Sequence, residues 1–285
     1  MSETRSKNAI VLGMPRSGTS FAAAIFARQG YYVTSDPEQD LRQGDEHNPF
    51  GYWEAGPLVE ANSEVLRRVG YEHHNTWIYP AIAEEAVARI RALEPSPEHR
   101  EFVQSYLPRH PWMWKDPRLC LTLSYWWKLM DPATTSVLLM KRSPESIYHS
   151  FRRVNWIQGG AEAHAEVIYK IGQHVGEAER TLREMHIPHT VVDYDRTVES
   201  PGGVAMSVGE TFGLTLSDAD LNVQRGLDHS KLTNRLWVSA KREVGLLPAP
   251  LRRALKRLIP SAVYRIAFPE KRFETDNGKA KPGKT

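Results

Sequence analysis

Two glycines near the start of the chain, Gly13 and Gly18, frame a short loop whose residue types suit the binding of an anion. The apolar run Ala9–Leu12 before the loop predicts a buried strand, and the alanine-rich run after it predicts a helix that Thr19 caps. Backbone N–H groups of such a loop and the positive end of such a helix point at the same small volume. The sequence therefore predicts a site for a phosphate-like group.

The cation of this loop is not where a nucleotide triphosphatase has it. In a phosphate-binding P-loop, a lysine directly follows the second glycine and reaches the outer phosphates. Here Thr19 stands in that place, and the nearest cation is Arg16, inside the loop. The pattern therefore favours an anion other than a metal-bound triphosphate.

A second segment, Lys141–Arg153, pairs an arginine with a hydroxyl at a spacing that suits another phosphate. It follows the apolar run Ser136–Met140, which predicts a strand, and Pro144 suits the first turn of a helix. Ser150 comes eight residues after Arg142, about two turns into that helix. An exposed arginine and an ordinary serine would give the same pattern, but its occurrence together with the glycine loop favours a second phosphate.

Strand and helix patterns alternate along the chain, which predicts the fold class. We expect an α/β protein with a three-layer P-loop-type fold, in which a central, mostly parallel β-sheet is flanked by helices. Ligands of such sheets bind at the carboxyl ends of strands, and polar residues follow each expected strand. We expect one domain over residues 1–268 with a helical insertion at about 57–110, and a disordered tail at 269–285. The other expected strands are Tyr31–Thr34, Trp112–Trp114 and His189–Val192.

Composition limits the classes of function. The net charge of +3 is too small to argue for a nucleic-acid partner. A single cysteine, Cys120, excludes an intramolecular disulfide and a cysteine-based metal cluster. The N-terminal residues lack the apolar core of a signal peptide, and no apolar run approaches the roughly 18 residues that cross a bilayer. We therefore expect a cytoplasmic enzyme with no transmembrane segment.

Taken in order, the segments resemble the signatures of sulfotransferases that use 3′-phosphoadenosine 5′-phosphosulfate (PAPS) as donor. G-M-P-R-S-G-T-S, Gly13–Ser20, resembles their 5′-phosphosulfate loop, and R-S-P-E-S-I-Y-H-S, Arg142–Ser150, resembles their 3′-phosphate segment. W-K-D-P-R-L, Trp114–Leu119, and N-P-F-G-Y-W-E, Asn48–Glu54, look like segments of a mainly bacterial branch of this P-loop superfamily. The resemblance covers the chain from about residue 9 to residue 214.

The resemblance implies a donor site built from both signature segments. V-V-D-Y-D, Val191–Asp195, is similar to the family's Y-E-D-L segment, whose tyrosine contacts adenine. Two departures remain: Asp195 stands where the family has a glutamate, and no clean Arg-Lys-Gly segment follows Leu214, where Arg225 and Lys231 are the candidates. The implied donor-binding residues are Pro15, Arg16, Ser17, Gly18, Thr19, Ser20, Arg142, Ser150 and Tyr194.

The resemblance also implies the chemistry. A sulfuryl group carries less negative charge than a terminal phosphoryl group, so fixed cations and N–H donors can stabilise its transfer without a metal. PAPS is then the donor and 3′-phosphoadenosine 5′-phosphate (PAP) the product, and no metal is expected. Arg16 would hold the 5′-phosphosulfate, Lys115 would be a second cation near the bridging oxygen, and Arg142 with Ser150 would hold the 3′-phosphate.

The acceptor must lose a proton as it attacks, so the site needs a base. Glu54 is the first candidate, because the branch with its segment resembles enzymes that use a glutamate; a carboxylate that caps the following helix is the alternative reading. His47 is the second candidate, although it also reads as a solvated loop histidine, and Asp45 and Glu46 are weaker ones.

Other polar and aromatic residues near these segments have simpler expected roles. Asp116 is expected to form an ion pair with Lys115 or Arg118 rather than act as a base. Four tryptophans have the positions of core residues: Trp112, Trp114, Trp126 and Trp127. Four aromatic residues in irregular segments could form a wall for the acceptor: Tyr52, Trp53, Trp77 and Tyr79.

The acceptor and the oligomeric state stay open at this point. A hydroxyl or amine of a small molecule or a carbohydrate would suit the chemistry. Two other functions also remain: a P-loop kinase of a small molecule, which shares the fold and the glycine loop, and a nucleotide-binding interaction protein without turnover. In the latter, the insertion Ala81–Leu107 and the basic run Leu251–Phe268 would serve a partner.

Overall fold

The structure is a computed structural model that describes residues 6–41, 44, 48, 51–72, 81–217 and 220. All of these residues belong to one unit of the chain, Met1–Leu227. Several predictions above therefore fall outside the described residues: those for Asp45, Glu46, His47, Trp77, Tyr79, Arg225, Lys231, the basic run Leu251–Phe268 and the tail 269–285.

A parallel sheet of four strands, in the order β2-β1-β3-β4, forms the centre of the described part. All five residues of β1 are buried, and Val11 on this strand pairs with Lys115 on one side and Leu138 on the other. The carboxyl end of β1 is thus the point where the chain order of the neighbouring strands reverses, which is where ligands of such sheets bind. The strands are β1 (Asn8–Leu12), β2 (Met113–Lys115), β3 (Thr135–Lys141) and β4 (His189–Asp193).

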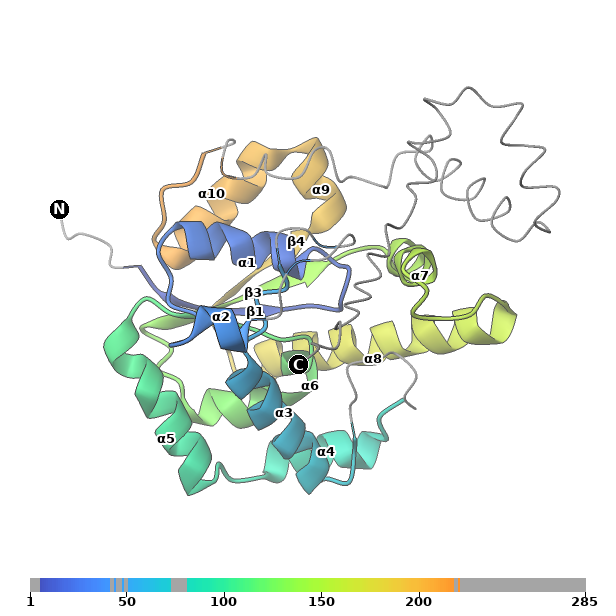
Figure 1. Cartoon of the computed structure of the whole chain (residues 1–285), viewed down its shortest axis with the longest axis horizontal. Coiled ribbons are helices and arrows are strands. Elements are labelled where there is room, and N and C mark those ends of the chain that lie inside the picture. The colour runs from blue at the N-terminus through green and yellow to red at the C-terminus, as the bar shows by residue number, and fades with distance from the viewer. Residues whose placement is uncertain are drawn as a thin grey trace, which may run out of the picture. The chain divides into compact units, whose positions relative to one another are not determined.

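Helices cover both faces of the sheet (Figure 1). On one face, Phe26 and Phe212 pack with their ring centroids 4.9 Å apart and join the two helices to which they belong. This arrangement confirms the predicted α/β class with a parallel sheet between helical layers. The helices of that face are α1 (Thr19–Arg28), α9 (Tyr194–Glu199) and α10 (Pro201–Phe212), and those of the other face include α6 (Leu119–Trp126) and α8 (Ala161–Glu184).

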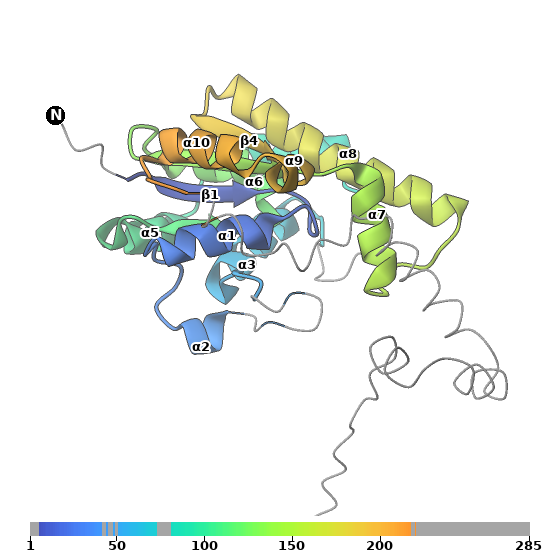
Figure 2. The same ribbon diagram turned by 90° about the horizontal axis from the view of Figure 1, so that it is seen from above.

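One helix, α7 (Pro144–Arg153), follows β3 and lies beyond the carboxyl ends of the strands in both views (Figures 1 and 2). Ser143 caps it by accepting a hydrogen bond from the N–H of Ser146, and Pro144 takes the first position, as the sequence predicts. The second predicted phosphate segment therefore lies at the carboxyl edge of the sheet, and so does the glycine loop.

The predicted helical insertion lies between α1 and β2. The apolar face of its first long helix is buried through Leu58, Ala61 and Val65, which follow the predicted helical spacing. The elements here are α2 (Pro37–Asp40), α3 (Gly56–Arg68), α4 (Glu84–Ala92), α5 (Pro97–Tyr106) and the 3₁₀ turn η1 (Leu107–Arg109); a second 3₁₀ turn, η2 (Trp127–Leu129), follows α6.

Aromatic side chains fill the space between β2 and the helices that cover it. Trp112 and Trp114 are two residues apart, project from the same face of the chain and are each 1% exposed. Trp114 meets Trp126 edge to face with ring centroids 5.4 Å apart, and Phe102 stacks on Trp114. The prediction that the four tryptophans belong to the core is confirmed, since Trp127 is buried as well.

Two local predictions were wrong. Tyr31–Thr34 forms no strand: Tyr32 alone makes a bridge with Trp112, because Asp36 soon caps a new helix by accepting from the N–H of Gln39. Thr19 is not the cap of α1 but its first residue, since Gly18 takes the cap position with φ 98°. The Thr19 side chain is buried instead, so packing in the core, and not capping, determines its position in the helix.

Candidate functional site

The glycine loop owes its shape to residues with a left-handed backbone. Gly13 has φ 143°, Arg16 has φ 70° and Gly18 has φ 98°. The hydroxyl of Ser17 donates to the carbonyl of Met14 at 2.7 Å and holds the turn closed. A loop with this conformation turns backbone N–H groups inward, which makes a concavity for an anion.

Both glycines are required by close neighbours. A Cβ atom on Gly18 would lie 2.2 Å from the ring of Tyr194, and one on Gly13 would lie 2.6 Å from the carbonyl oxygen of Met140. The loop therefore packs directly on β3 and on the residue that begins α9. Any larger side chain at either position would push the loop away from those neighbours.

The structure brings the two predicted phosphate segments together. Arg16 Nε donates to Ser150 Oγ at 3.1 Å, although the two residues are 134 positions apart. Arg142 Nη1 donates to the backbone carbonyl of Arg16 at 3.1 Å. Two arginines and one serine from different segments thus form one cluster at the end of β1 and β3.

Tyr194 directly follows the last residue of β4 and lies next to this cluster. Its side chain is buried and meets the ring of Phe21 edge on, with centroids 6.0 Å apart. The guanidinium of Arg142 lies over its ring, 4.8 Å from the centroid, and Arg142 Nε lies 3.5 Å from the Asp195 carboxylate. Tyr194 therefore supports Arg142, and its contact with an adenine stays a prediction.

Arg153 joins the same cluster, a contact that the sequence reading missed. Its Nη2 donates to Ser150 Oγ at 3.0 Å. Burial first, and then the nearby charges of Arg16 and Arg142, lower the pKa of Arg153 to about 10. The available signal was its spacing, because a residue three positions after Ser150 on a helix lies on the same side.

A second cluster pairs the predicted base with the predicted second cation. Lys115, the last residue of β2, donates to Glu54 Oε1 at 2.5 Å. Their side chains are 2% and 18% exposed, so Glu54 is the partner that solvent reaches. The reading of Glu54 as a helix cap is not supported, because Ala55 takes the cap position of α3 and no side chain caps that helix.

The segment before Glu54 is tied to the helix after the glycine loop. Asn48 Nδ2 donates to Ser20 Oγ at 3.0 Å and to the carbonyl of Gly51 at 2.8 Å. Tyr52 is buried, and Trp53 is partly buried with φ 59°. These contacts hold Glu54 beside the start of α1, whereas the place of His47 lies outside the described residues.

Asp116 confirms the expected ion pair. Its Oδ1 accepts from the backbone N–H of Arg118 at 3.0 Å and from the guanidinium at 2.9 Å, while Oδ2 accepts from Asn62 at 2.9 Å. Burial raises the pKa of Asp116, and Arg118 acts against that shift. Because it is enclosed by these partners, Asp116 supports the end of β2 rather than taking a proton from a substrate.

Two kinds of feature are absent from the described residues. Within 6–41, 44, 48, 51–72, 81–217 and 220, no cluster of three or more His, Cys, Asp or Glu side chains could hold a metal ion. In the same part of the chain, no helix has the length and apolar character needed to cross a membrane.

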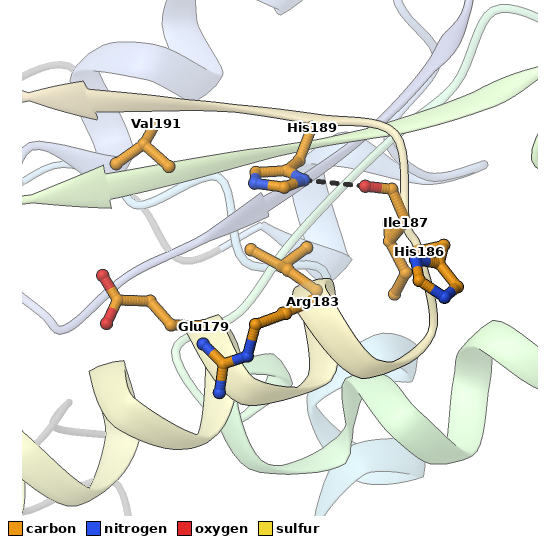
Figure 3. Close-up of a pocket in the computed structure, with 7 residues that line it drawn as sticks. Glu179, Arg183, His186, Ile187, His189 and Val191 are labelled. Carbon is orange, nitrogen blue, oxygen red and sulfur yellow. Dashed lines mark hydrogen bonds between the residues drawn. The ribbon is translucent and has the colours of Figure 1, made fainter.

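An open groove of about 650 Å³ lies elsewhere, between the last turns of α8 and the start of β4 (Figure 3). His189, at the amino end of β4, donates from Nδ1 to the carbonyl of Ile187 at 2.7 Å. Because the glycine loop lies at the carboxyl edge of the sheet, this groove is not part of the site above. Its lining consists of Glu179, Leu182, Arg183, His186, Ile187, His189 and Val191.

Comparisons with known proteins place few limits on this chain. No protein-family model matches it, and no curated protein matches it. Among solved structures, it is similar to the sulfotransferase STF1 of Mycobacterium tuberculosis H37Rv, with 14% identity and a TM-score of 0.48 over 78% of this chain and 72% of that chain. We therefore infer the function from the residues of the site.

Proposed function

We propose that this protein is a cytoplasmic, PAPS-dependent sulfotransferase acting on a hydroxyl or amine of a small molecule or carbohydrate. The observation that supports it most is the contact between Arg16 and Ser150. It joins a phosphate-type loop, which has no P-loop lysine, to a second segment rich in hydrogen-bond donors for an anion. A ligand that spans both needs two separate anionic groups, as the 5′-phosphosulfate and the 3′-phosphate of PAPS provide.

The donor atoms of the cluster fit such a ligand. Arg142 Nε is buried and makes no hydrogen bond within the described part of the chain, although Asp195 lies near it. Arg16 and the N–H groups of the loop would hold the 5′-phosphosulfate, and Arg142 with Ser150 would hold the 3′-phosphate. Tyr194 would contact the adenine. The other loop residues, Pro15, Ser17, Gly18, Thr19 and Ser20, would shape the site.

The pair of Glu54 and Lys115 would carry out the proton transfer. When bound, PAPS supplies an activated sulfuryl group that moves to the acceptor as its bond to phosphate breaks. Glu54 would take the proton that the acceptor loses, since its carboxylate is partly exposed and is oriented by Lys115. Lys115 would hold positive charge at its Nζ close to the reacting groups. His47 is the alternative base.

Nucleotide titration tests the donor assignment. We expect PAP to bind at least about 100-fold more tightly than adenosine 5′-phosphate, because the 3′-phosphate adds charge-assisted hydrogen bonds. Isothermal titration calorimetry measures both affinities. Equal affinities would remove the second phosphate site from the proposal.

A transfer assay tests the reaction itself. Incubation with PAPS and a broad panel of acceptors should give an acceptor that gains one sulfo group by mass spectrometry, with no requirement for Mg²⁺. The P-loop kinase remains the rival enzyme, and activity that requires ATP and Mg²⁺ would establish it instead.

A further inference from the structure

Arg153 lies at the same hydroxyl as Arg16, three residues beyond the signature stretch Arg142–Ser150. Its side chain is half-buried at the last turn of α7, and its Nη2 donates to Ser150 Oγ at 3.0 Å. Arg16 Nε donates to the same oxygen at 3.1 Å. Two guanidinium groups from elements far apart in the sequence therefore converge on one buried oxygen.

The hydrogen bonds of Ser150 leave its proton for another partner. A serine hydroxyl has two acceptor positions and one donor hydrogen. Arg16 and Arg153 occupy both acceptor positions. The O–H of Ser150 can then donate outward, and two cationic donors polarise it toward an acceptor that carries negative charge. This arrangement is suited to a phosphate oxygen.

The charges of the cluster favour the same ligand. Arg142 donates to the carbonyl of Arg16, so three guanidinium groups gather within one cluster, and Asp195 brings one carboxylate to it. The pKa of Arg153 falls to about 10, mainly through burial and then through Arg16 and Arg142. Positive charges that repel one another in a half-buried place become favourable when a dianion binds among them.

The neighbouring arginine shows that this placement is specific. Arg152 is one position earlier, but its guanidinium lies 5.8 Å from the ring centroid of Tyr148. It also packs against the backbone at Gly159, where an added Cβ would lie 2.9 Å from its Nη2. Arg152 therefore serves another part of the structure and offers a matched control for the loss of one positive charge.

We propose that Arg153, the third cation of the cluster, is a second cation of the 3′-phosphate site beside Arg142, contacts that phosphate directly and contributes to selection of 3′-phosphorylated nucleotides. This inference rests on the proposed function, because it takes PAPS as the donor. It assigns part of the donor specificity to the last turn of α7, which lies outside the signature segment ending at Ser150.

Calorimetric titration of two nucleotides tests this assignment. Wild type, Arg153→Ala, Arg153→Lys and Arg152→Ala are titrated with PAP and with adenosine 5′-phosphosulfate, which lacks the 3′-phosphate. We expect Arg153→Ala to weaken PAP binding by about 10- to 100-fold, the range of one charge-assisted hydrogen-bonding group, and to change adenosine 5′-phosphosulfate binding by less than about 2-fold. Arg153→Lys should recover part of the loss, because it keeps the charge but not the planar fork. Arg152→Ala should bind both nucleotides as wild type does.

A double-variant comparison separates direct contact from an effect through the serine. In a Ser150→Ala background, Arg153→Ala should still weaken PAP binding. If it causes no further loss there, Arg153 only positions Ser150 and the direct contact is wrong. Thermal unfolding of each variant checks folding, and Arg153→Lys carries the test if the alanine variant does not fold.

The remaining outcomes distinguish this inference from the proposed function. If wild type prefers PAP and Arg153→Ala keeps the same preference, the role of Arg153 is overturned and the PAPS-dependent function stands. An equal loss for both nucleotides also overturns the role. If wild type does not distinguish the two nucleotides, the 3′-phosphate site fails and both proposals fall.

Discussion

The two clusters at the carboxyl edge of the sheet differ in their balance of charge. We call the first the donor corner and define it as Arg16, Arg142, Ser150, Arg153 and Tyr194. Two of its guanidinium groups donate to one serine hydroxyl, and the third donates to the backbone carbonyl of Arg16. In the second, the acceptor corner of Glu54 and Lys115, one carboxylate meets one ammonium. An excess of positive charge prepares a place for an anion, whereas a matched pair leaves room for an uncharged group that loses a proton. The difference indicates which substrate each corner would take.

The corners also differ in how they are built. The donor corner depends on backbone shape, since a left-handed Gly18 lets the loop pack on the ring of Tyr194. The acceptor corner depends on side chains, because Lys115 precedes the buried Asp116, which Arg118 holds. A change of backbone should therefore damage donor binding, and a change of one side chain should damage proton transfer alone.

The largest expected effect comes from the acceptor corner. Replacing Glu54 by Gln keeps its size but removes the proton acceptor, so the rate of sulfuryl transfer should fall by about 10²- to 10⁴-fold. PAP binding should stay within about 2-fold of wild type, because the donor corner is unchanged. Turnover is measured by mass spectrometry of a sulfated acceptor, and PAP affinity by calorimetry.

The matching control for this change is His47→Ala. If Glu54→Gln retains near-normal turnover while His47→Ala loses it, the base has been assigned to the wrong residue. If Glu54→Gln lowers both the turnover and the PAP affinity, the comparison between the two corners fails. A melting curve separates that result from simple loss of folding, since Lys115 would then be buried beside a neutral amide.

A change in the loop should produce the next largest effect. In Gly18→Ala, the new Cβ meets the Tyr194 ring in a backbone conformation with φ 98°. We expect the free energy of unfolding to fall by about 2–4 kcal/mol, from strain and overpacking together, and PAP binding to weaken as the loop moves. Denaturant unfolding measures the first effect and calorimetry the second.

Gly30→Ala is the control for backbone strain alone. Gly30 also has a positive φ, 83°, but nothing lies within 4 Å of a Cβ placed there. It should cost about 1 kcal/mol and leave PAP binding unchanged. Equal losses in the free energy of unfolding for Gly18→Ala and Gly30→Ala would mean that packing of the loop on Tyr194 contributes little to stability. The claim that the donor corner depends on backbone shape would then lose its support.

Sequence patterns predicted the framework well, because hydrophobic period and turn chemistry are local properties. The apolar run before Gly13 and the proline that opens α7 each occur where the pattern indicated. The strand ends then followed from parallel topology, which brings Arg16, Lys115 and Arg142 to one edge. Local signals with a strict geometric meaning were therefore enough to predict the layers of the fold.

Contacts between distant residues could not be predicted in the same way. The cap of α1 falls on Gly18 because Thr19 is drawn into the core, and a packing preference of that kind has no local signature. The pairing of Glu54 with Lys115 joins residues 61 positions apart. The spacing of Arg153 to Ser150 is that of two residues on the same side of a helix. It did not predict a shared site, because Arg16, which donates to the same oxygen, is far away in the sequence.

The smallest expected effect concerns salt, and it compares the two corners in one experiment. Raising ionic strength shortens the screening length from about 10 Å at 0.1 M to about 3 Å at 1 M. PAP binding should weaken by about 5- to 10-fold over that range, because Arg16 and Arg153 are part-exposed and attract an anion. The KM of an uncharged acceptor should change by less than about 2-fold, because Glu54 and Lys115 neutralise each other and Lys115 is buried. Calorimetry and steady-state rates at matched salt concentrations measure the two slopes. Equal slopes would show that the donor corner has no excess charge in practice, while a flatter PAP slope in Arg153→Ala would identify that arginine as one source of the charge.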